Sequence, residues 1–458
     1  MSDPTSSIEY ARSQSERYLA ELKAFIAIPS ISTMAEHKPD MQRAAEWVAD
    51  QVRGFGMEHV QIMPTAGHSV VYADWLHASG KQTILVYGHY DVQPTDPLNE
   101  WVTPPFEPTV RGDNLYARGA SDMKGQVQGV LKALEALLHS GELPVNIKVM
   151  VEGEEEIGSP NLGQFVREHA GQLACDVVLN ADAGILRPDQ PSLVYGLRGL
   201  AYFELWVYGP DHDLHSGVFG GSVHNPVQVL CELIAGMHDA NGHVTLPGFY
   251  DRVRTLDAEE RTSLAEGAHT DAEWQRMTGV PQLYGEAGFT TSERLGARPT
   301  LEVNGILGGF TGEGQKTVLP ARAMAKISTR LVPYQIDTDV ERQFKDYLTQ
   351  HTPPTVRWDL RNLSSAPGVL VERDTAAARA AGEALSTTFG VAPLFRLEGG
   401  SVPVVSLVQA ELGVNSILMG FGLPDDNLHA PNEKLHLPNF YKGIETYIRF
   451  FHYMADSE

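Results

Sequence analysis

The amino-acid sequence predicts an α/β protein whose mostly parallel sheet is sandwiched by helices and carries a smaller inserted α+β domain. Before Pro191, apolar strand-like runs alternate with amphipathic helical stretches, which is typical of a parallel sheet covered on both faces. The texture then changes to half-exposed strands, and the first pattern resumes after Thr375. At 458 residues the chain exceeds what one hydrophobic core usually serves, so two domains are expected.

The first part of the chain supplies the predicted parallel sheet. Apolar residues at helical spacing predict helices over 8–28, 41–55 and 123–139. Short apolar runs predict strands over 59–63, 69–76, 83–87, 146–151 and 176–179. The stretch 92–112 is rich in Pro, Asp and aromatic residues and predicts an irregular loop. In such folds, functional groups gather at the carboxyl ends of the strands.

The middle of the chain predicts a separate layer of two helices among about four strands. Its strands include 200–208, 322–332 and 356–360, and its helices are 226–238 and an Asp-capped helix over 337–351. This composition suggests a split βαβ, ferredoxin-like layer. The polar stretch 251–293 decorates it with short helices and loops.

The last part of the chain returns to the first domain. It contains a helix to Phe389, a Gly-rich turn at 398–401, a further helix, a strand over 416–419 and a final helix over 439–454. The predicted boundaries give a catalytic domain of residues 1–196 and 366–458. The inserted domain is 197–365.

Composition restricts the partners and the location. The hydrophobic share of 42% and charged share of 20% are those of a folded globular protein. A net charge of -23 disfavours nucleic acid and anionic membranes, which require clustered Lys and Arg. The two cysteines, Cys175 and Cys231, lie in apolar contexts that favour buried thiols over a disulfide. No signal peptide or long apolar span is evident, so we expect a cytoplasmic protein.

Histidine and acidic residues follow several of the apolar runs. His89 lies in Tyr-Gly-His-Tyr-Asp-Val, and Glu156 ends Glu-Gly-Glu-Glu-Glu. A His in an apolar context is more often a core residue, and a Glu-rich run is more often a solvated surface. Together, however, five residues can hold two divalent cations that share one carboxylate. The predicted metal ligands are His89, Asp122, Glu156, Asp182 and His429, with Asp122 as the shared one.

Two further acidic residues have predicted roles beside the cations. Asp91 follows His89 by two residues and can hold the second N–H of its ring. Glu155 precedes the predicted ligand Glu156, and adjacent residues in a tight turn can point in different directions. We therefore predict Glu155 as the general acid and base that takes a proton from water and delivers it to a leaving amine. The mixed nitrogen and oxygen ligands favour zinc, with manganese or cobalt as alternatives.

With these motifs, the chain resembles the dinuclear-zinc peptidase family that includes carnosinases, aminoacylases, desuccinylases and glutamate carboxypeptidases. The resemblance covers nearly the whole length. It is carried by Gly-Ala-Ser-Asp122-Met-Lys-Gly, Glu-Glu155-Glu156-Ile-Gly-Ser, Asn-Ala-Asp182 and His429-Ala-Pro-Asn-Glu-Lys, together with the His89 motif. The cytosolic non-specific dipeptidase and carnosinase branch is the most similar, through Asp-Leu-His215-Ser-Gly, Ser-Thr-Arg330-Leu and Glu-Gly-Gly400-Ser401.

The resemblance implies a dizinc exopeptidase-like catalytic domain with an inserted lid and dimerisation domain. It implies that His215 reaches across a homodimer interface to polarise the scissile carbonyl. It also implies that Arg330 binds the substrate carboxylate, assisted by Gly400 and Ser401. The sequence departs from the animal dipeptidases at Ile157, where a small polar residue is expected, and the segment 251–298 has no clear counterpart. Preferred substrate side chains therefore stay open.

The predicted function is hydrolysis of dipeptides or short peptides with a free C-terminal carboxylate. In this prediction a hydroxide shared by both cations attacks the amide, and the insert closes as a lid. One alternative is a deacylase acting on N-acyl amino acids, because the same cations serve both amides. The other is a catalytically silent interaction protein that uses the metal site structurally.

Overall fold

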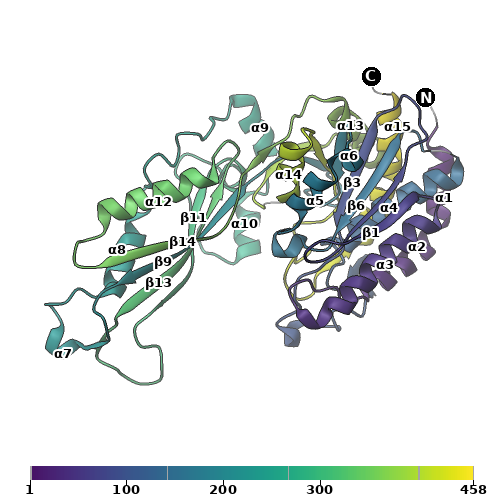
Figure 1. Cartoon of the computed structure of the whole chain (residues 1–458). Helices are drawn as coiled ribbons and strands as arrows, with labels where there is room; N and C mark the ends of the chain where they lie inside the picture. The colour runs from purple at the N-terminus through teal and green to yellow at the C-terminus, as the bar shows by residue number, and fades with distance from the viewer. Residues whose placement is uncertain (1–2, 142, 267, 401–402, 457–458) are drawn as a thin grey trace. The chain divides into compact units, whose positions relative to one another are not determined.

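A computed structural model describes residues 3–141, 143–266, 268–400 and 403–456 of the chain (Figure 1). The chain divides into two compact units. The first unit comprises Met1–Tyr195, Val371–Arg396 and Val402–Glu458, and the inserted unit comprises Gly196–Leu370 and Leu397–Ser401.

The main sheet has the strand order β1-β2-β6-β3-β7-β17-β8-β15, and β16 also pairs with β8. The pairings β6–β3, β3–β7 and β7–β17 are parallel, whereas those towards both edges are antiparallel. The predicted mostly parallel centre is therefore confirmed. The strands are β1 Glu58–Met63, β2 Val70–Trp75, β3 Thr83–His89, β6 Asn146–Glu152, β7 Val177–Asn180, β8 Ser192–Leu197, β15 Val369–Leu370, β16 Leu394–Glu398 and β17 Ser416–Leu418.

Helices cover both faces of this sheet (Figure 1). On one face, α4 packs on β3 and on α15, α13 packs on α15, and α3 packs on β1 and β2. On the other face, α14 packs against α5 and β17. The helices are α1 Thr5–Ser13, α2 Ser15–Ile26, α3 Lys38–Gly54, α4 Lys124–Ser140, α5 Leu162–Glu168, α6 Ala170–Leu173, α13 Ala376–Phe389, α14 Pro403–Glu411 and α15 Leu437–Asp456, with short 3-10 turns η1 Ala35–His37, η2 Leu98–Glu100 and η3 Glu155–Ile157.

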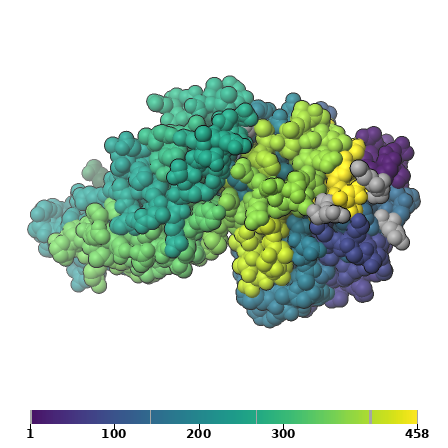
Figure 2. Space-filling model, turned by 90° about the horizontal axis from the view of Figure 1, so that it is seen from above, coloured from purple at the N-terminus to yellow at the C-terminus, as the bar shows by residue number. Residues whose placement is uncertain are grey.

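The two ends of the chain lie side by side. Helix α1 packs on α15, and Arg12 pairs with Glu445 at 2.7 Å. Figure 2 shows the purple N-terminal part next to the yellow C-terminal helix. The predicted single helix over 8–28 is wrong, because α1 and α2 are separated at Gln14, whose φ of -99° and ψ of 6° are not helical. The hydroxyl of Ser13 donates to the carbonyl of Tyr10 there, which competes with the helical backbone pattern.

A small second sheet lies within the predicted irregular loop and the last part of the chain. Its strands are β4 Thr109–Arg111, β5 Asn114–Tyr116 and β18 Lys434–His436, and β5 pairs with both neighbours in antiparallel fashion. The prediction of a structureless stretch over 92–112 therefore missed η2 and β4. These strands are only three residues long, too short for a periodic signal.

The inserted unit has a four-stranded antiparallel sheet of order β11-β13-β9-β14. With α8 and α12 the chain order is βαββαβ, the predicted ferredoxin-like layer. Alternate residues of β9 (Ala201, Phe203, Leu205 and Val207) are buried in its core. The elements are β9 Gly199–Tyr208, β10 Leu214–His215, α7 Ser216–Phe219, α8 Pro226–Gly236, α9 Ala258–Glu266, α10 Asp271–Thr278, α11 Thr291–Gly296, β11 Thr300–Gly308, β12 Val318–Leu319, β13 Arg322–Leu331, α12 Asp337–His351 and β14 Arg357–Ala366.

Two smaller predictions are wrong. The N-cap of α12 is Ile336, which makes no side-chain cap, and Asp337 is the first helical residue. Cys231 is exposed because it lies on the outward side of α8, while Val229 and Leu233 face the core. Both cysteines are free thiols, as expected. None of the helices in the described ranges combines the length and apolar character needed to cross a membrane.

Candidate metal centre

Three neighbouring strands bring most of the predicted ligands to one edge of the main sheet. His89 is the last residue of β3. Glu155 and Glu156 lie in η3 beyond β6, and Asp182 lies two residues beyond β7. Because β6, β3 and β7 are adjacent and parallel, their carboxyl ends meet at the same edge.

Asp122 and His429 arrive from loops beside the small sheet. Asp122 lies in the turn between β5 and α4, and His429 lies in the loop between β17 and β18. Pairing of β18 with β5, with Lys434 opposite Tyr116, brings the two loops together. These two residues therefore come from loops, unlike His89, Glu156 and Asp182, which lie at or just beyond strands of the main sheet.

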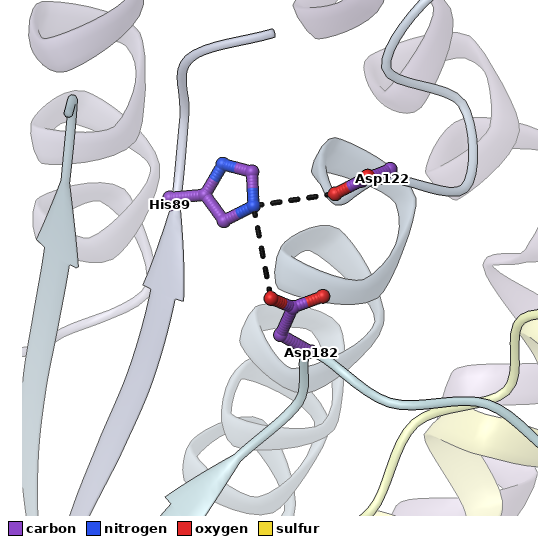
Figure 3. A group of neighbouring side chains, drawn as sticks. All are labelled: His89, Asp122 and Asp182. Atoms are coloured by element: carbon purple, nitrogen blue, oxygen red, sulfur yellow. Dashed lines mark ion pairs between the residues drawn. The ribbon is translucent and has the colours of Figure 1, made fainter. Parts of the chain in front are cut away.

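The carboxylate of Asp122 lies between the two imidazole rings. Its Oδ1 is 3.3 Å from Nε2 of His89, and its Oδ2 is 3.0 Å from Nε2 of His429. On the first side, His89 Nε2 is also 4.0 Å from Oδ2 of Asp182, and Figure 3 shows the three side chains pointing toward one another. On the second side, His429 Nε2 is 3.2 Å from Oε2 of Glu156. The ligand atoms of each group lie within 4.8 Å of one another.

Asp91 holds both His89 and the paired glutamates. Nδ1 of His89 lies 3.1 Å from the Asp91 carbonyl and 3.3 Å from its Oδ1. The same carboxylate accepts hydrogen bonds from the backbone N–H groups of Glu155 at 3.3 Å and Glu156 at 3.1 Å. His89 and Asp91 are both fully buried. In the neutral ring, the acceptors around Nδ1 favour a proton there, so that the lone pair lies on Nε2.

The residues fit a pair of cations. Nε2 of His89 is buried and makes no well-aligned hydrogen bond within the described part of the chain, although it faces two carboxylates. A buried, unsatisfied ring nitrogen is costly unless a ligand completes it. Each group offers one imidazole and two carboxylates, a donor set suited to zinc, manganese or cobalt.

The pKa values of the buried groups also indicate that the site would be stabilised by added positive charge. Burial raises the pKa of Glu155 well above its usual range; His89 opposes this rise, and Asp182 adds to it. Burial raises the pKa of Glu156, against a hydrogen bond from His429. Hydrogen bonds to Asp122 and Glu156 raise the pKa of His429 to about 10. Without cations, the centre therefore holds protons that bound metal would displace.

Gln93 is a residue of this centre that the sequence analysis missed. Its Nε2 donates to Oε2 of Glu156 at 2.8 Å and to the Glu156 carbonyl at 3.2 Å. His89, Asp91 and Gln93 alternate along an extended segment, so their side chains share one side. That spacing of two was the signal available in the sequence.

His215 belongs to the inserted unit, where it is the N-cap of α7. Its side chain is exposed, and Nδ1 accepts a hydrogen bond from the backbone N–H of Gly217 at 2.8 Å. Because Nδ1 is the acceptor, the neutral ring carries its proton on Nε2. His215 is therefore set as a donor to an oxygen.

The other predicted substrate residues also lie in the inserted unit. Arg330 is half-buried near the end of β13, and Gly400 is exposed. Ser401 lies outside the described residues. Arg198, which the sequence analysis missed, is buried and donates from Nε to the carbonyl of Gly399 at 3.3 Å. Burial lowers the pKa of Arg198 to about 10, and the charge of Arg330 contributes. Both Arg198 and Arg330 carry a guanidinium group, the chemistry that suits an anion.

Two adjoining groups of candidate metal ligands, built from strand ends of a sheet and from neighbouring loops, fit a metal-dependent hydrolase. Comparison with known proteins supports the assignment to the metal-dependent hydrolases. The sequence model of the peptidase family M20/M25/M40 matches residues 85–453, and the chain belongs to this family. It is 32% identical to the Cys-Gly metallodipeptidase dug1 of Schizosaccharomyces pombe over 96% of both chains. It is 31% identical to the human Beta-Ala-His dipeptidase, covering 98% of this chain and 92% of the relative.

Solved structures are similar over the whole fold. A metallo-carboxypeptidase of the M20 family from Sulfolobus solfataricus, Sso-CP2, has a TM-score of 0.85 at 33% identity, covering 96% of this chain and 99% of that one. The similarity extends over both units, so the catalytic fold and the insert are shared.

Proposed function

We propose that this protein is a metal-dependent dipeptidase that hydrolyses the amide bond of dipeptides or short peptides with a free C-terminal carboxylate. The observation that carries the proposal is the Asp122 carboxylate between the imidazoles of His89 and His429, at 3.3 and 3.0 Å. The names of the relatives, a Cys-Gly metallodipeptidase and a Beta-Ala-His dipeptidase, support dipeptides as the substrate class.

Two divalent cations are part of the proposal, with zinc as the first choice and manganese or cobalt as alternatives. His89 and Asp182 would hold one cation, His429 and Glu156 the other, and Asp122 both. When bound, such cations polarise an amide carbonyl and make water more acidic. Asp91 would fix the ring of His89 through Nδ1, and Gln93 would fix Glu156.

Glu155 is proposed as the general base and acid. Its carboxylate takes part in no hydrogen bond or ion pair with the described residues, whereas its backbone N–H is held by Asp91. It is therefore free to accept a proton from water at a carboxylate oxygen and to pass that proton to the leaving amine. The raised pKa of Glu155, caused chiefly by burial, suits a group that must carry a proton between the two steps.

The inserted unit is proposed to act as a lid and a dimerisation surface. His215 would donate its Nε2 proton to the carbonyl oxygen of a substrate held by the partner subunit, a role that its N-cap geometry supports. Arg330, with Gly400 and Ser401, would bind the free carboxylate of the substrate, and Arg198 would strengthen the positive field there. A homodimer and a cytoplasmic location complete the proposal, the latter supported by two free thiols.

The nearest rival is a deacylase that removes an acyl group from an amino acid. Hydrolysis rates on Ala-Ala-type dipeptides are to be compared with those on N-acetyl and N-succinyl amino acids, with zinc or manganese present. We expect turnover of the dipeptides. Activity confined to the acyl compounds would replace the dipeptidase by a deacylase, and a fully loaded but inactive protein would favour a structural metal site.

A further inference from the structure

The carboxylate of Glu433 is buried against the turn that carries Asp122. Its exposed fraction is 0%. Oε1 accepts hydrogen bonds from the backbone N–H groups of Ser121 at 2.9 Å and Asp122 at 3.0 Å. Oε2 accepts from the N–H of Gly119 at 2.9 Å and from Nη1 of Arg118 at 2.8 Å. Three of the four donors are thus backbone groups of one turn.

This arrangement is more than a buried ion pair. Burying two charges is costly, and a well-packed apolar pair would serve stability as well or better. Besides the hydrogen bond from Arg118, the Glu433 carboxylate accepts three hydrogen bonds from backbone N–H groups of the Asp122 turn. Its geometry therefore fixes where the Asp122 side chain begins.

Glu433 lies in the same loop as His429, which precedes it by four positions in the chain. A second buried carboxylate, Asp426, connects this loop to the turn that carries Asp122. Its Oδ2 accepts from Oγ of Ser121 at 2.7 Å, and its Oδ1 accepts from Nζ of Lys434 at 3.0 Å. The backbone N–H of Lys434 also donates to the carbonyl of Asp426 at 3.0 Å. The His429 loop and the Asp122 turn are therefore one connected unit.

We propose that Glu433 is a positioning residue for the cation held by Asp122, Glu156 and His429. It joins the segments that carry two of these three ligands, and so sets the 3.0 Å approach of Asp122 Oδ2 to His429 Nε2. On the His89 side it supports only Asp122, because His89 is held by Asp91. The inference rests on the proposed function for its two-cation centre, and it assigns unequal support to the two positions.

The test is Glu433→Gln in the full chain, which keeps the shape but turns an amide N–H₂ toward N–H donors. Cobalt(II) and zinc binding are measured by competition with a chromophoric chelator, and cobalt sites are followed by their visible absorption. We expect the cation held by Asp122, Glu156 and His429 to be the weaker of the two, because His429 is the more exposed histidine. In Glu433→Gln its affinity should fall roughly 10–100-fold, and its absorption band should be lost first. The dipeptidase rate should fall in parallel.

Glu135→Gln is the matched control. Glu135 is also buried in a charged cluster, with Lys132 at 2.8 Å, but it lies near the far end of α4 from Asp122. It should lower the thermal midpoint without changing either cation affinity. Glu433→Asp is the second variant and serves if Glu433→Gln fails to fold. It keeps the charge but shortens the side chain, so it should also weaken binding of the cation held by Asp122, Glu156 and His429.

The outcomes separate the two claims. If the Glu433 variants bind both cations as tightly as the Glu135→Gln control, and lose only thermal stability, the positioning role is overturned. If the unsubstituted protein binds two cations but hydrolyses no dipeptide, the proposed function fails, and the cation titrations still decide the role of Glu433.

Discussion

The two candidate ligand groups of the proposed metal centre share the same chemistry, but their histidines are held in different ways. His89 ends a strand of the main sheet, its side chain is 0% exposed, and Asp91 holds its ring. The side chain of His429 is 55% exposed and lies in a loop with three left-handed residues, Asn427, His429 and Asn432. His89 is therefore fixed by secondary structure, whereas the position of His429 depends on contacts between loops. This difference predicts unequal responses to substitution.

The largest effect is expected where the two groups meet. Asp122→Ala removes the ligand common to both, so we expect both cations to be lost at micromolar concentrations. Activity should fall at least about a thousandfold, since cation assistance is worth several kcal/mol. Metal content after desalting and dipeptide hydrolysis measure this. Asp50→Ala, which replaces an exposed acid paired with Arg53 on α3, is the control. Retention of one tight cation by Asp122→Ala would contradict a shared carboxylate.

Glu155→Gln tests chemistry without disturbing either group. The substitution removes the proton acceptor but keeps the size of the side chain, so kcat should fall by roughly 10²–10⁴-fold. Metal content and KM should change little. Steady-state kinetics together with metal analysis distinguish the result from that of Asp122→Ala. If the metal is lost together with the activity, Glu155 is a ligand rather than a base.

The free energy of unfolding, measured after a chelator has removed any metal, should differ between variants of the two histidines. His89→Ala removes a buried ring and leaves the Asp91 carboxylate with one donor fewer, which should cost about 1–3 kcal/mol of unfolding free energy. His429→Ala removes a ring whose interactions are screened by solvent and should cost less than about 1 kcal/mol. Urea unfolding in the presence of chelator measures both. Equal losses would remove the distinction between a sheet-held and a loop-held ligand.

The grouping of the candidate ligands was easier to predict from the sequence than the contacts that hold them in place. His89, Glu156 and Asp182 follow apolar runs that end at one sheet edge, so their spacing along the chain carries structural information. Glu433 lies inside a motif quoted for His429, yet its hydrogen bonds to residues more than 300 positions earlier have no local signature. Long-range contacts between loops depend on tertiary structure alone.

The same distinction explains the fold. Long periodic elements such as α4, α12 and β13 are close to their predicted ranges, because periodicity accumulates over many residues. The break at Gln14 and the strands β4 and β5 were missed, since a single side-chain hydrogen bond or a three-residue strand leaves no pattern. The small sheet that brings Asp122 to His429 was therefore beyond the sequence analysis.

The pH dependence of metal-free stability is a weaker test of the same comparison. The pKa of His429 is raised from 6.5 to about 10, so its stabilising interactions are complete below pH 6.5 and are lost as the pH rises through 10. Burial lowers the pKa of Lys124 to about 7, which acts in the opposite direction. The informative quantity is therefore the difference in thermal midpoint between the unsubstituted protein and His429→Ala. We expect this difference to shrink between pH 6.5 and 10, and a constant difference would argue against protonated His429.

The smallest effect is expected for the substitution Gln93→Ala. Gln93 is a residue that connects the two groups. Gln93 follows Asp91 on the segment that holds His89, but its amide donates to Glu156, a ligand of the His429 group. Loss of one hydrogen bond to a charged ligand should weaken the second cation by no more than about tenfold. Chelator competition should show this change for the weaker cation alone. Gln42→Ala, on the surface of α3, provides the control because its amide donates to Glu46 at 2.8 Å, a carboxylate outside both groups. If Gln93→Ala weakened the tighter cation instead, the His89 group would depend on Glu156, and the two groups would be coupled through more than Asp122.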